Sequence, residues 1–414
     1  MNIKYRQTCR ICGNRNFREV IDLGYQYFQG SFRNNSGLLP SRKTPNLVVR
    51  CDTSKDENAC GLIQTKHTVP PRILYTNYWY ESGISDTMKK HLSSIVTECL
   101  SITKKQNGNV VDIASNDNTL LRNYPDGFMK VGVDPSNIAA KQNDKDITVI
   151  NDLFPTDGLD YLKGKVDIIT SIACFYDIDN PKEFANSVQE LLRNDGVWVI
   201  EVAYWPSMLQ NIAYDSIVNE HIIHYHLAPL EILFSLCGLK IFDARKTNAN
   251  GGSILIFACK SKYIKFDSIE SRKRLADIRM EEFNLALDEE STYDIFRSKV
   301  MASKEELVSL LKSLVASDKT IHIYGASTKL NTILEYCGIG IDLIQFAAER
   351  SLSKVGGKTM SGIKIIYESE SLKMKPDYYL VGPYHFKEEI LKRNAENRKN
   401  GIKFIFPLPK VEIV

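Results

Sequence analysis

Strand-like and helix-like patterns alternate in two stretches of this chain. Between residues 107 and 260, short runs of β-branched residues are separated by segments with helical spacing. Residues 262–318 are charged and carry apolar residues at every third or fourth position, which predicts helices. A second alternating stretch follows, with the runs TIHIYGAS, IDLIQFAAE, DYYLVGP and IKFIFPLP. The pattern predicts two α/β units, of which the first has a largely parallel sheet.

The first 106 residues have a different pattern. Residues 1–68 hold four of the nine cysteines and show little helical periodicity. Residues 69–106 run from a tyrosine-rich stretch into an amphipathic helix. We therefore expect a small module at 1–68, an α/β domain that begins with a helical lid at 69–260, and a second α/β domain at 261–414.

Composition excludes several classes of protein. An apolar fraction of 43% and a charged fraction of 25% over 414 residues are typical of a soluble globular protein. The net charge of +3 gives no reason to expect a nucleic-acid partner. No stretch approaches the ~20 apolar residues of a transmembrane helix, and the N-terminus lacks the apolar core of a signal peptide. We expect a cytoplasmic protein that acts as a monomer without a membrane partner.

The cysteines of the first module have the spacing of a metal site. Cys9 and Cys12 form a C-x-x-C corner followed by glycine, and Cys51 and Cys60 form a wider pair, also followed by glycine. In a reducing compartment such clusters more often bind metal than form disulfides. We predict a structural Zn²⁺ held by all four cysteines. A buried pair with two unrelated cysteines is the alternative, and His67 is a weaker candidate ligand.

Three acidic residues follow strands of the first α/β unit. Asp112 ends an apolar run before the turn ASNDNTLL, Asp134 ends the next run and Asp152 the third. Ligands of open α/β sheets bind at the carboxyl ends of the strands, so these carboxylates can meet the ribose and adenine of an adenosine cofactor. The order fits S-adenosylmethionine as well as NAD. A turn without any ligand is the third possibility.

The turn itself favours S-adenosylmethionine. It lacks the G-x-G-x-x-G pattern that a pyrophosphate requires, and S-adenosylmethionine has no phosphate. Ala114 stands where glycine would fit best, and Asn118 stands at a second glycine position, where asparagine tolerates left-handed angles. The downstream segment 166–202 resembles the later half of a class I methyltransferase fold. The predicted cofactor-binding residues are Asp112, Ala114, Asn116, Asp134, Pro135 and Asp152.

Three of the seven histidines lie in YDSIVNEHIIHYH, at positions 221, 224 and 226. Histidine is suited to move protons near neutral pH, and the spacing is not that of an H-E-x-x-H metal site. We favour a proton-transfer site over buried structural imidazoles. The run Tyr78, Trp79 and Tyr80 can close over a sugar ring or a cofactor.

With these motifs the chain resembles the S-adenosylmethionine-dependent sugar C-methyltransferases, over nearly its whole length. The resemblance rests on CRICG, VIDLGYQYFQGSF and ACGLIQ, then YTNYWYESG, VVDIASNDNTLL and VGVDPSNIA, then NEHIIHYHLAPLEILFSLCGLKIFDARKTNANGGS, and finally IYGASTKLNTILEY, GPYHF and FIFPLP. It implies a class I methyltransferase Rossmann-like core, flanked by an N-terminal zinc-binding module and a C-terminal Rossmann-like domain that binds the sugar nucleotide.

The resemblance also implies residue roles. His221 matches a general base with Glu220 beside it, Tyr78 or Tyr80 matches an active-site tyrosine, and Asp134 holds the ribose. Substrate-binding residues on the C-terminal side are Lys329, Asn331 and His385. The implied reaction is C-methylation of a nucleotide-linked 4-keto-deoxysugar next to its ketone: His221 forms an enolate, and Tyr78, Tyr80 or His224 supports the oxyanion.

The chain departs from the family pattern at several positions. The usual His-Glu-His triplet is Asn219-Glu220-His221, preceded by Val218, where the family often has tyrosine. Ala114, Asn118 and Leu330 stand at common glycine positions, and we expect backbone strain at Leu330 if its φ is positive. These departures leave two alternatives, a sugar O- or N-methyltransferase and a nucleotide-sugar-binding pseudoenzyme.

Overall fold

The computed structural model describes residues 3–30, 32, 43–76, 78 and 80–414. Its largest sheet has seven strands, and its order confirms a largely parallel α/β unit. In spatial order they are β12 (Leu239–Thr247), β13 (Ser253–Lys260), β10 (Leu192–Ala203), β9 (Val166–Ile172), β6 (Gly108–Ile113), β7 (Phe128–Val133) and β8 (Ile147–Ile150). The five strands from β10 to β8 run parallel, and β13 is antiparallel to both of its neighbours.

Helices cover both faces of this sheet because consecutive strand residues point to opposite sides. In β6, Val110 packs with the residues of α2 (Asp86–Thr103), whereas Val111 packs on the side of α3 (Pro181–Leu191) and α5 (Leu227–Leu236). Ile168 and Ile169 of β9 divide in the same way. Each strand is therefore apolar on both faces, as expected of a buried parallel strand.

The N-terminal module contains a two-stranded and a four-stranded sheet. β1 (Lys4–Tyr5) pairs with β5 (His67–Thr68), close to α1 (Pro71–Tyr75) in the chain. The four-stranded sheet has the order β11, β4, β3, β2. Three strands come from the module: β2 (Phe17–Gln26), β3 (Thr44–Cys51) and β4 (Ile63–Thr65). The fourth, β11 (Ile223–His224), comes from the segment between α4 (Trp205–Gln210) and α5. The domain boundaries at 68 and 260 remain a prediction, since this sheet draws on both sides of the first one.

The C-terminal part forms a second doubly wound sheet. Its order is β16 (Lys364–Tyr367), β15 (Phe346–Glu349), β14 (Ile321–Tyr324), β17 (Tyr378–Val381), β18 (Lys403–Phe406) and β19 (Glu412–Ile413). All pairs are parallel except the last. The helices of this part are α8 (Thr328–Cys337), α9 (Glu368–Lys373), α10 (Lys387–Arg393) and α11 (Ala395–Lys399).

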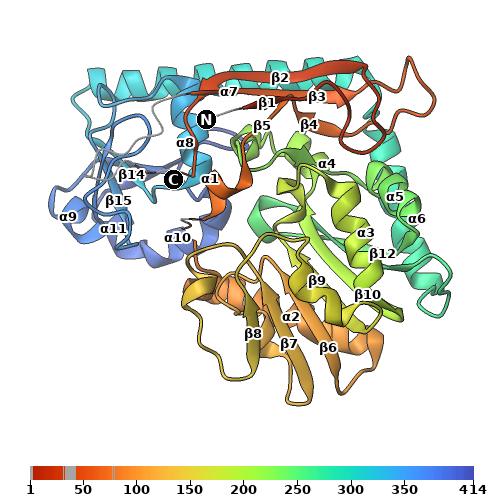
Figure 1. Cartoon of the computed structure of the whole chain (residues 1–414). Helices are drawn as coiled ribbons and strands as arrows, with labels where there is room; N and C mark the ends of the chain where they lie inside the picture. Colours follow the sequence, from red (N-terminus) through yellow and green to blue (C-terminus); the bar gives the residue numbers. More distant parts are fainter. Residues whose placement is uncertain (1–2, 31, 33–42, 77, 79) are drawn as a thin grey trace.

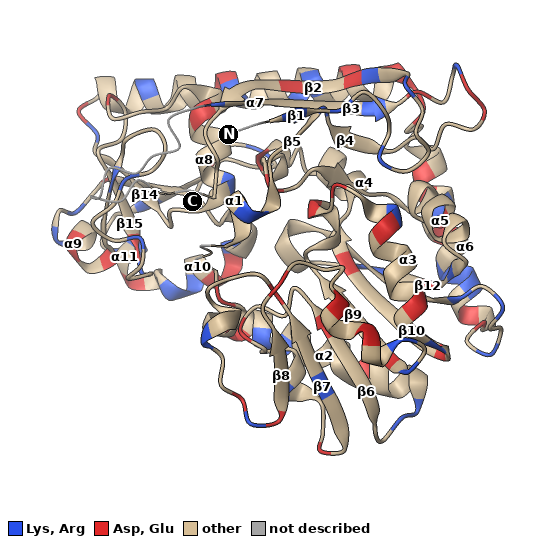
Figure 2. Cartoon of the chain, viewed as in Figure 1, with Lys and Arg blue, Asp and Glu red and all other residues tan. Residues whose placement is uncertain are grey.

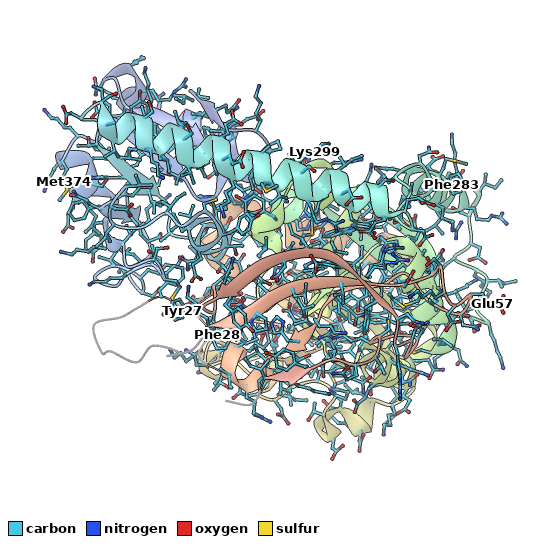
Figure 3. All side chains as sticks on the ribbon, turned by 90° about the horizontal axis from the view of Figure 1, so that it is seen from above. Tyr27, Phe28, Glu57, Phe283, Lys299 and Met374 are labelled. Carbon is cyan, nitrogen blue, oxygen red and sulfur yellow. The ribbon has the colours of Figure 1, made fainter. Side chains whose placement is uncertain are left out.

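The helical stretch expected at 262–318 forms α6 (Ile269–Asn284) and α7 (Glu290–Ala316). Helix α7 lies along β2 and β3 and reaches from α6 to the C-terminal sheet (Figures 1 and 3). Its buried residues follow at three- to four-residue steps and include Phe296, Val300, Leu307 and Leu311. They share one apolar core with β2, β3 and the C-terminal sheet. Helix α7 therefore joins the first and last parts of the chain.

Charged residues of both signs are mixed along α7 and over the rest of the chain (Figure 2). Within the described residues, no helix is long and apolar enough to cross a bilayer.

Candidate active site and metal centre

A cavity of about 510 Å³ lies at the carboxyl ends of the parallel strands. Its wall includes the loops after β6, β7, β9 and β10, the lid segment before α2, the segment 216–221 and the start of α8. Residues from all three parts of the chain therefore meet at one site, where an open α/β sheet is expected to bind its ligand.

The turn after β6 adopts a glycine-like backbone without glycine. Ala114, Asn116 and Asn118 have φ angles of 64°, 51° and 62°. The Ala114 amide donates to the carbonyl of Val133 at 2.7 Å, which holds the turn against β7. The expected left-handed geometry at Asn118 is confirmed, and Ala114 shares it. Ala114 lines the cavity, and its side chain is a single methyl group, the smallest that a non-glycine residue can place beside a ligand.

Two carboxylates are fixed beside this turn. The Asp134 carboxylate accepts backbone N–H bonds from Asn116 at 2.9 Å and from Ser136 at 2.8 Å. Asp112 accepts a bond from the Thr170 hydroxyl at 2.6 Å, and burial raises the pKa of Asp112 to about 7. Both side chains line the cavity. Each Asp134 oxygen keeps a second lone pair for the hydroxyl of a ligand.

The lid is tied to the same turn. The Asn116 side chain donates to the Tyr80 carbonyl at 2.9 Å and accepts from the Ser82 amide at 3.0 Å. Asp117 accepts from the Gly83 amide at 2.7 Å. These bonds hold the lid against the turn at the edge of the cavity.

His221 lines the cavity from the segment that precedes β11. Its Nδ1 lies 3.1 Å from the Ser216 carbonyl oxygen, which can only accept. Nδ1 therefore carries the proton, and Nε2 keeps its lone pair. The imidazole lies against the ring of Tyr176, with 4.3 Å between the ring centroids. Burial, assisted by the nearby Lys329 ammonium, lowers the pKa of His221 to about 4.

Glu220 lines the cavity next to His221. One of its oxygens accepts from the Gly30 amide at 2.9 Å, and the other has no hydrogen-bond partner among the described residues. Burial raises the pKa of Glu220. The hydroxyl of Tyr75 donates to the Glu220 carbonyl at 3.3 Å, so the lid side also contacts this segment.

Three further cavity residues were missed in the sequence. Asp177 is fully enclosed, and burial raises its pKa well above the ordinary value, with Glu220 nearby adding to the effect. Glu201 bonds to His91 at 2.7 Å and to Thr247 at 2.7 Å. Tyr176 contacts His221. The sequence could have indicated these residues, because they follow β9 directly or lie at the end of β10. Residues at the carboxyl ends of parallel strands line such sites.

The four cysteines of the N-terminal module converge as predicted. Their sulfur atoms all lie within 4.8 Å of one another, with Cys9 to Cys60 and Cys12 to Cys51 at 3.5 Å. Four thiolates at Zn–S distances of ~2.3 Å in a tetrahedron lie roughly 3.8 Å apart, so the cluster fits a closed zinc site. His67 is outside it, because its Nε2 bonds to the Asn219 side chain at 2.8 Å.

Comparison with known proteins gives the same order of parts. Three family models match: "Putative zinc binding domain" at residues 9–75, "Methyltransferase domain" at 85–243 and "C-methyltransferase C-terminal domain" at 248–409. The C-methyltransferase NovU of Streptomyces niveus is 29% identical over 98% of this chain and 96% of its own length. The chain is therefore a methyltransferase that carries a C-methyltransferase C-terminal domain.

Solved structures resemble this methyltransferase more distantly. The PH0226 protein of Pyrococcus horikoshii is 16% identical over 44% of this chain and 94% of its own, with a TM-score of 0.34. The plantazolicin methyltransferase BpumL in complex with SAH is 14% identical over 41% of this chain and 82% of its own, also with a TM-score of 0.34. Similarity at this level carries no inference about function.

The fold of this methyltransferase brings most of the predicted site residues into one cavity. Those that line it are Tyr78, Tyr80, Asp112, Ala114, Asn116, Asp134, Pro135, Asp152, Glu220, His221 and Lys329. Their roles remain predictions. Trp79 lies outside the described residues.

Three predicted residues do not line the cavity. His224 is buried in β11, with its ring 5.5 Å from that of Trp205. Asn331 is buried and donates to the Gln29 carbonyl at 2.8 Å. His385 lies close to Lys329, whose charge adds to the effect of burial in lowering the pKa of His385 to about 3. We therefore do not retain His224 as an oxyanion donor.

The expected strain at Leu330 is wrong. Leu330 lies in the first turn of α8, where its amide donates to the Ser327 hydroxyl at 3.1 Å, and it is not among the residues with positive φ. Its side chain is 1% exposed and belongs to the apolar core. A leucine there needs no glycine-like backbone.

Proposed function

We propose that this methyltransferase uses S-adenosylmethionine to methylate a carbon next to the ketone of a nucleotide-linked 4-keto-deoxysugar. The observation that supports this most is His221, whose unprotonated Nε2 belongs to a side chain lining the same cavity as the cofactor turn. A base is needed for C-methylation next to a ketone, because the carbon becomes a nucleophile only after it loses a proton.

The donor set of the cavity fits S-adenosylmethionine. Among the described lining residues, Lys329 is the only lysine or arginine, whereas eight carboxyl groups contribute to the wall. Burial raises the pKa values of Asp112, Asp177 and Glu220, which reduces their charge. With carboxyl groups so much more numerous than cations, the wall still favours a ligand with ammonium and sulfonium charges and disfavours a pyrophosphate. Asp134 would hold the ribose hydroxyls, with Asn116 and Pro135 beside it, and Asp152 would lie toward the adenine. The carboxyl groups are Asp112, Asp134, Asp152, Asp177, Asp179, Glu183, Glu201 and Glu220.

His221 and the two lid tyrosines would act on the sugar. His221 Nε2 takes the proton from the carbon next to the ketone, and the electron pair moves onto the ketone oxygen as an enolate. Burial raises the pKa values of Tyr78 and Tyr80, so their hydroxyls stay protonated and can donate to this oxygen. When bound, S-adenosylmethionine supplies the electrophilic methyl group that the enolate carbon takes up. The proton then leaves His221 for solvent.

The cavity charge also bears on how the nucleotide sugar is placed. An acidic wall repels a diphosphate, so we place only the sugar ring inside. The diphosphate would remain toward Lys329 and His385, on the C-terminal side of the cavity. The Lys329 ammonium donates to the Asn250 carbonyl at 2.6 Å and is available there to meet an anionic group.

The test is to identify the methylated atom. The protein is incubated with a nucleotide-linked 4-keto-deoxysugar and S-adenosylmethionine that carries a ¹³C methyl group, and the product is analysed by NMR. The proposal predicts a new C–CH₃ signal. An O–CH₃ or N–CH₃ signal would support the alternative sugar methyltransferase and contradict a reaction through an enolate.

A further inference from the structure

The segment that carries Glu220 and His221 is held by the N-terminal module. Strand β11 follows it directly and pairs with β4, as Ile223 opposes Gln64 and His224 opposes Ile63. The amide of Thr65 also donates to the Ile222 carbonyl at 2.9 Å. The segment is therefore fixed on its C-terminal side by a sheet whose other strands come from residues 17–65.

On its N-terminal side the segment is fixed by buried side chains of the same module. Asn219 directly precedes Glu220 and is 0% exposed. Its side-chain oxygen accepts from the Thr44 hydroxyl at 2.7 Å and from His67 Nε2 at 2.8 Å. Its backbone amide and its side-chain amide both donate to the Gln29 side-chain oxygen at 3.0 Å. Asn219 thus makes four hydrogen bonds, all to the N-terminal module.

The hydrogen bonds around this segment pair each donor with an acceptor. The side-chain amide of Gln29 donates to the Gln26 side-chain oxygen at 2.7 Å, which turns the Gln29 oxygen toward Asn219. The Asn46 side-chain amide donates to the Ile217 carbonyl at 2.9 Å. Burying a polar group without a hydrogen-bond partner costs free energy. A network of this kind therefore stabilises the one conformation of the segment in which these bonds form, relative to alternative conformations.

The next residue of the segment reaches the same module. Gly30 donates its amide to the Glu220 carboxylate at 2.9 Å, and a β-carbon at Gly30 would overlap that carboxylate. Together with the Asn219 bonds, this contact sets how the chain enters Glu220 and His221.

We propose that Asn219 is a positioning residue. Its hydrogen bonds to the N-terminal module fix the backbone that leads to His221, so that His221 Nε2 stays directed at the substrate carbon. This inference rests on the proposed function, because it takes His221 as the base. The zinc-binding module would then contribute to the reaction indirectly, through the hydrogen bonds that Gln29, Thr44 and His67 make to Asn219. Asn219 itself need not contact the substrate.

The test compares substitutions at two asparagines that are almost equally buried. Asn219→Ala removes the side-chain bonds to the module. Asn394→Ala is the matched control: Asn394 is 1% exposed and bonds to Tyr324 and Ile390 inside the C-terminal part, away from the cavity. Gln29→Met is a second variant, which removes the acceptor of Asn219 while keeping the side-chain length, in case Asn219→Ala does not fold.

The first readout is exchange of the substrate α-proton for deuterium in the presence of S-adenosylhomocysteine. We expect Asn219→Ala or Gln29→Met to slow exchange at least 30-fold, with S-adenosylhomocysteine affinity within twofold of the wild type. Asn394→Ala should lose comparable thermal stability and exchange within twofold of the wild type. Exchange within twofold of the wild type in the folded Asn219 and Gln29 variants would overturn the inference.

The second readout does not depend on the reaction. NMR titration of the histidines gives the pKa of His221 in each variant, with Lys329 of α8 and Tyr176 after β9 as the groups that face it. Loss of positioning should raise this pKa toward 6.5 in the Asn219 and Gln29 variants only. An unchanged pKa would overturn the inference. If the wild type exchanges no proton while the pKa moves as expected, the proposed function fails and the positioning role stands.

Discussion

The imidazole of His221 is held in one tautomer by the Ser216 carbonyl, and its environment disfavours protonation. Of the two histidines predicted to take part in the reaction, His221 lines the cavity and His224 does not. The difference arises because His224 lies in β11 and points into the core, whereas His221 precedes the strand. A two-residue strand that pairs with a distant module leaves no periodic signal, so this distinction could not be predicted.

The low pKa of His221 predicts how activity depends on pH. A general base acts in its neutral form, so kcat/KM for the sugar should fall only as the pH drops toward about 4. With S-adenosylmethionine kept saturating, so that titration of Asp112 near pH 7 does not limit cofactor binding, activity at pH 5.5 should remain within about twofold of that at pH 7. Removing the nearby ammonium with Lys329→Met should raise the pKa of His221, measured by NMR titration. A wild-type pKa near 6.5 that Lys329→Met leaves unchanged would contradict this explanation.

Asp134 provides a prediction about the cofactor. Its carboxylate is already oriented by two backbone amides, so replacing it with Asp134→Asn should weaken S-adenosylhomocysteine binding by roughly 10- to 100-fold, the equivalent of one hydrogen bond to a charged group. Calorimetry measures this directly. The control is Asp157→Asn, an exposed carboxylate outside the cavity wall, which should bind as the wild type does. Equal affinity in both variants would contradict the assignment.

At the scale of elements, the alternation of apolar residues predicted the two α/β units and the helices between them. The turn after β6 was harder to predict, because its left-handed angles fall on alanine and asparagine instead of glycine. Leu330 shows the opposite error, since a position expected to have positive φ lies inside α8. Short-range patterns report periodicity, while single backbone angles depend on contacts that the sequence does not display.

The Ala114 backbone leads to a stability prediction. A non-glycine residue in the left-handed region costs roughly 1–2 kcal/mol, and glycine offsets part of that gain by its larger freedom in the unfolded chain. Ala114→Gly should therefore raise the free energy of unfolding by about 0.5–1 kcal/mol in urea titrations. The control is Ala185→Gly in helix α3, which should lower it by about 1 kcal/mol. A decrease of similar size at both positions would show that the turn is not strained.

At the scale of the whole molecule, three parts of the chain meet around one cavity. The cysteine cluster shares an apolar core with Tyr225 and the large sheet, and the module carries strand β4, which pairs with β11. The boundary predicted at residue 68 separates β4 from β11, although the two strands pair in one sheet. Strand pairing between distant segments depends on the complete fold and cannot be predicted from composition.

Metal removal tests this connection. Structural zinc sites contribute directly to folding, so chelation should release the module and, with it, residues 217–224. Hydrogen exchange should show lost protection in β2, β3, β4 and 217–224, while β6, β7 and β9 stay protected. Cys9→Ser should reproduce the effect in part. Unchanged protection of 217–224 in the metal-free protein would contradict the coupling.

The proposed reaction requires His221 to turn a carbon of the ketosugar into a nucleophile. The most direct measurement follows loss of the substrate α-proton to D₂O by NMR, with S-adenosylhomocysteine present so that no methyl group is transferred. We expect exchange in the wild type and at least a 100-fold slower exchange in His221→Gln, with normal binding of S-adenosylhomocysteine in the variant. Equal exchange in the two proteins, or none in a wild type that still methylates the sugar, would contradict it.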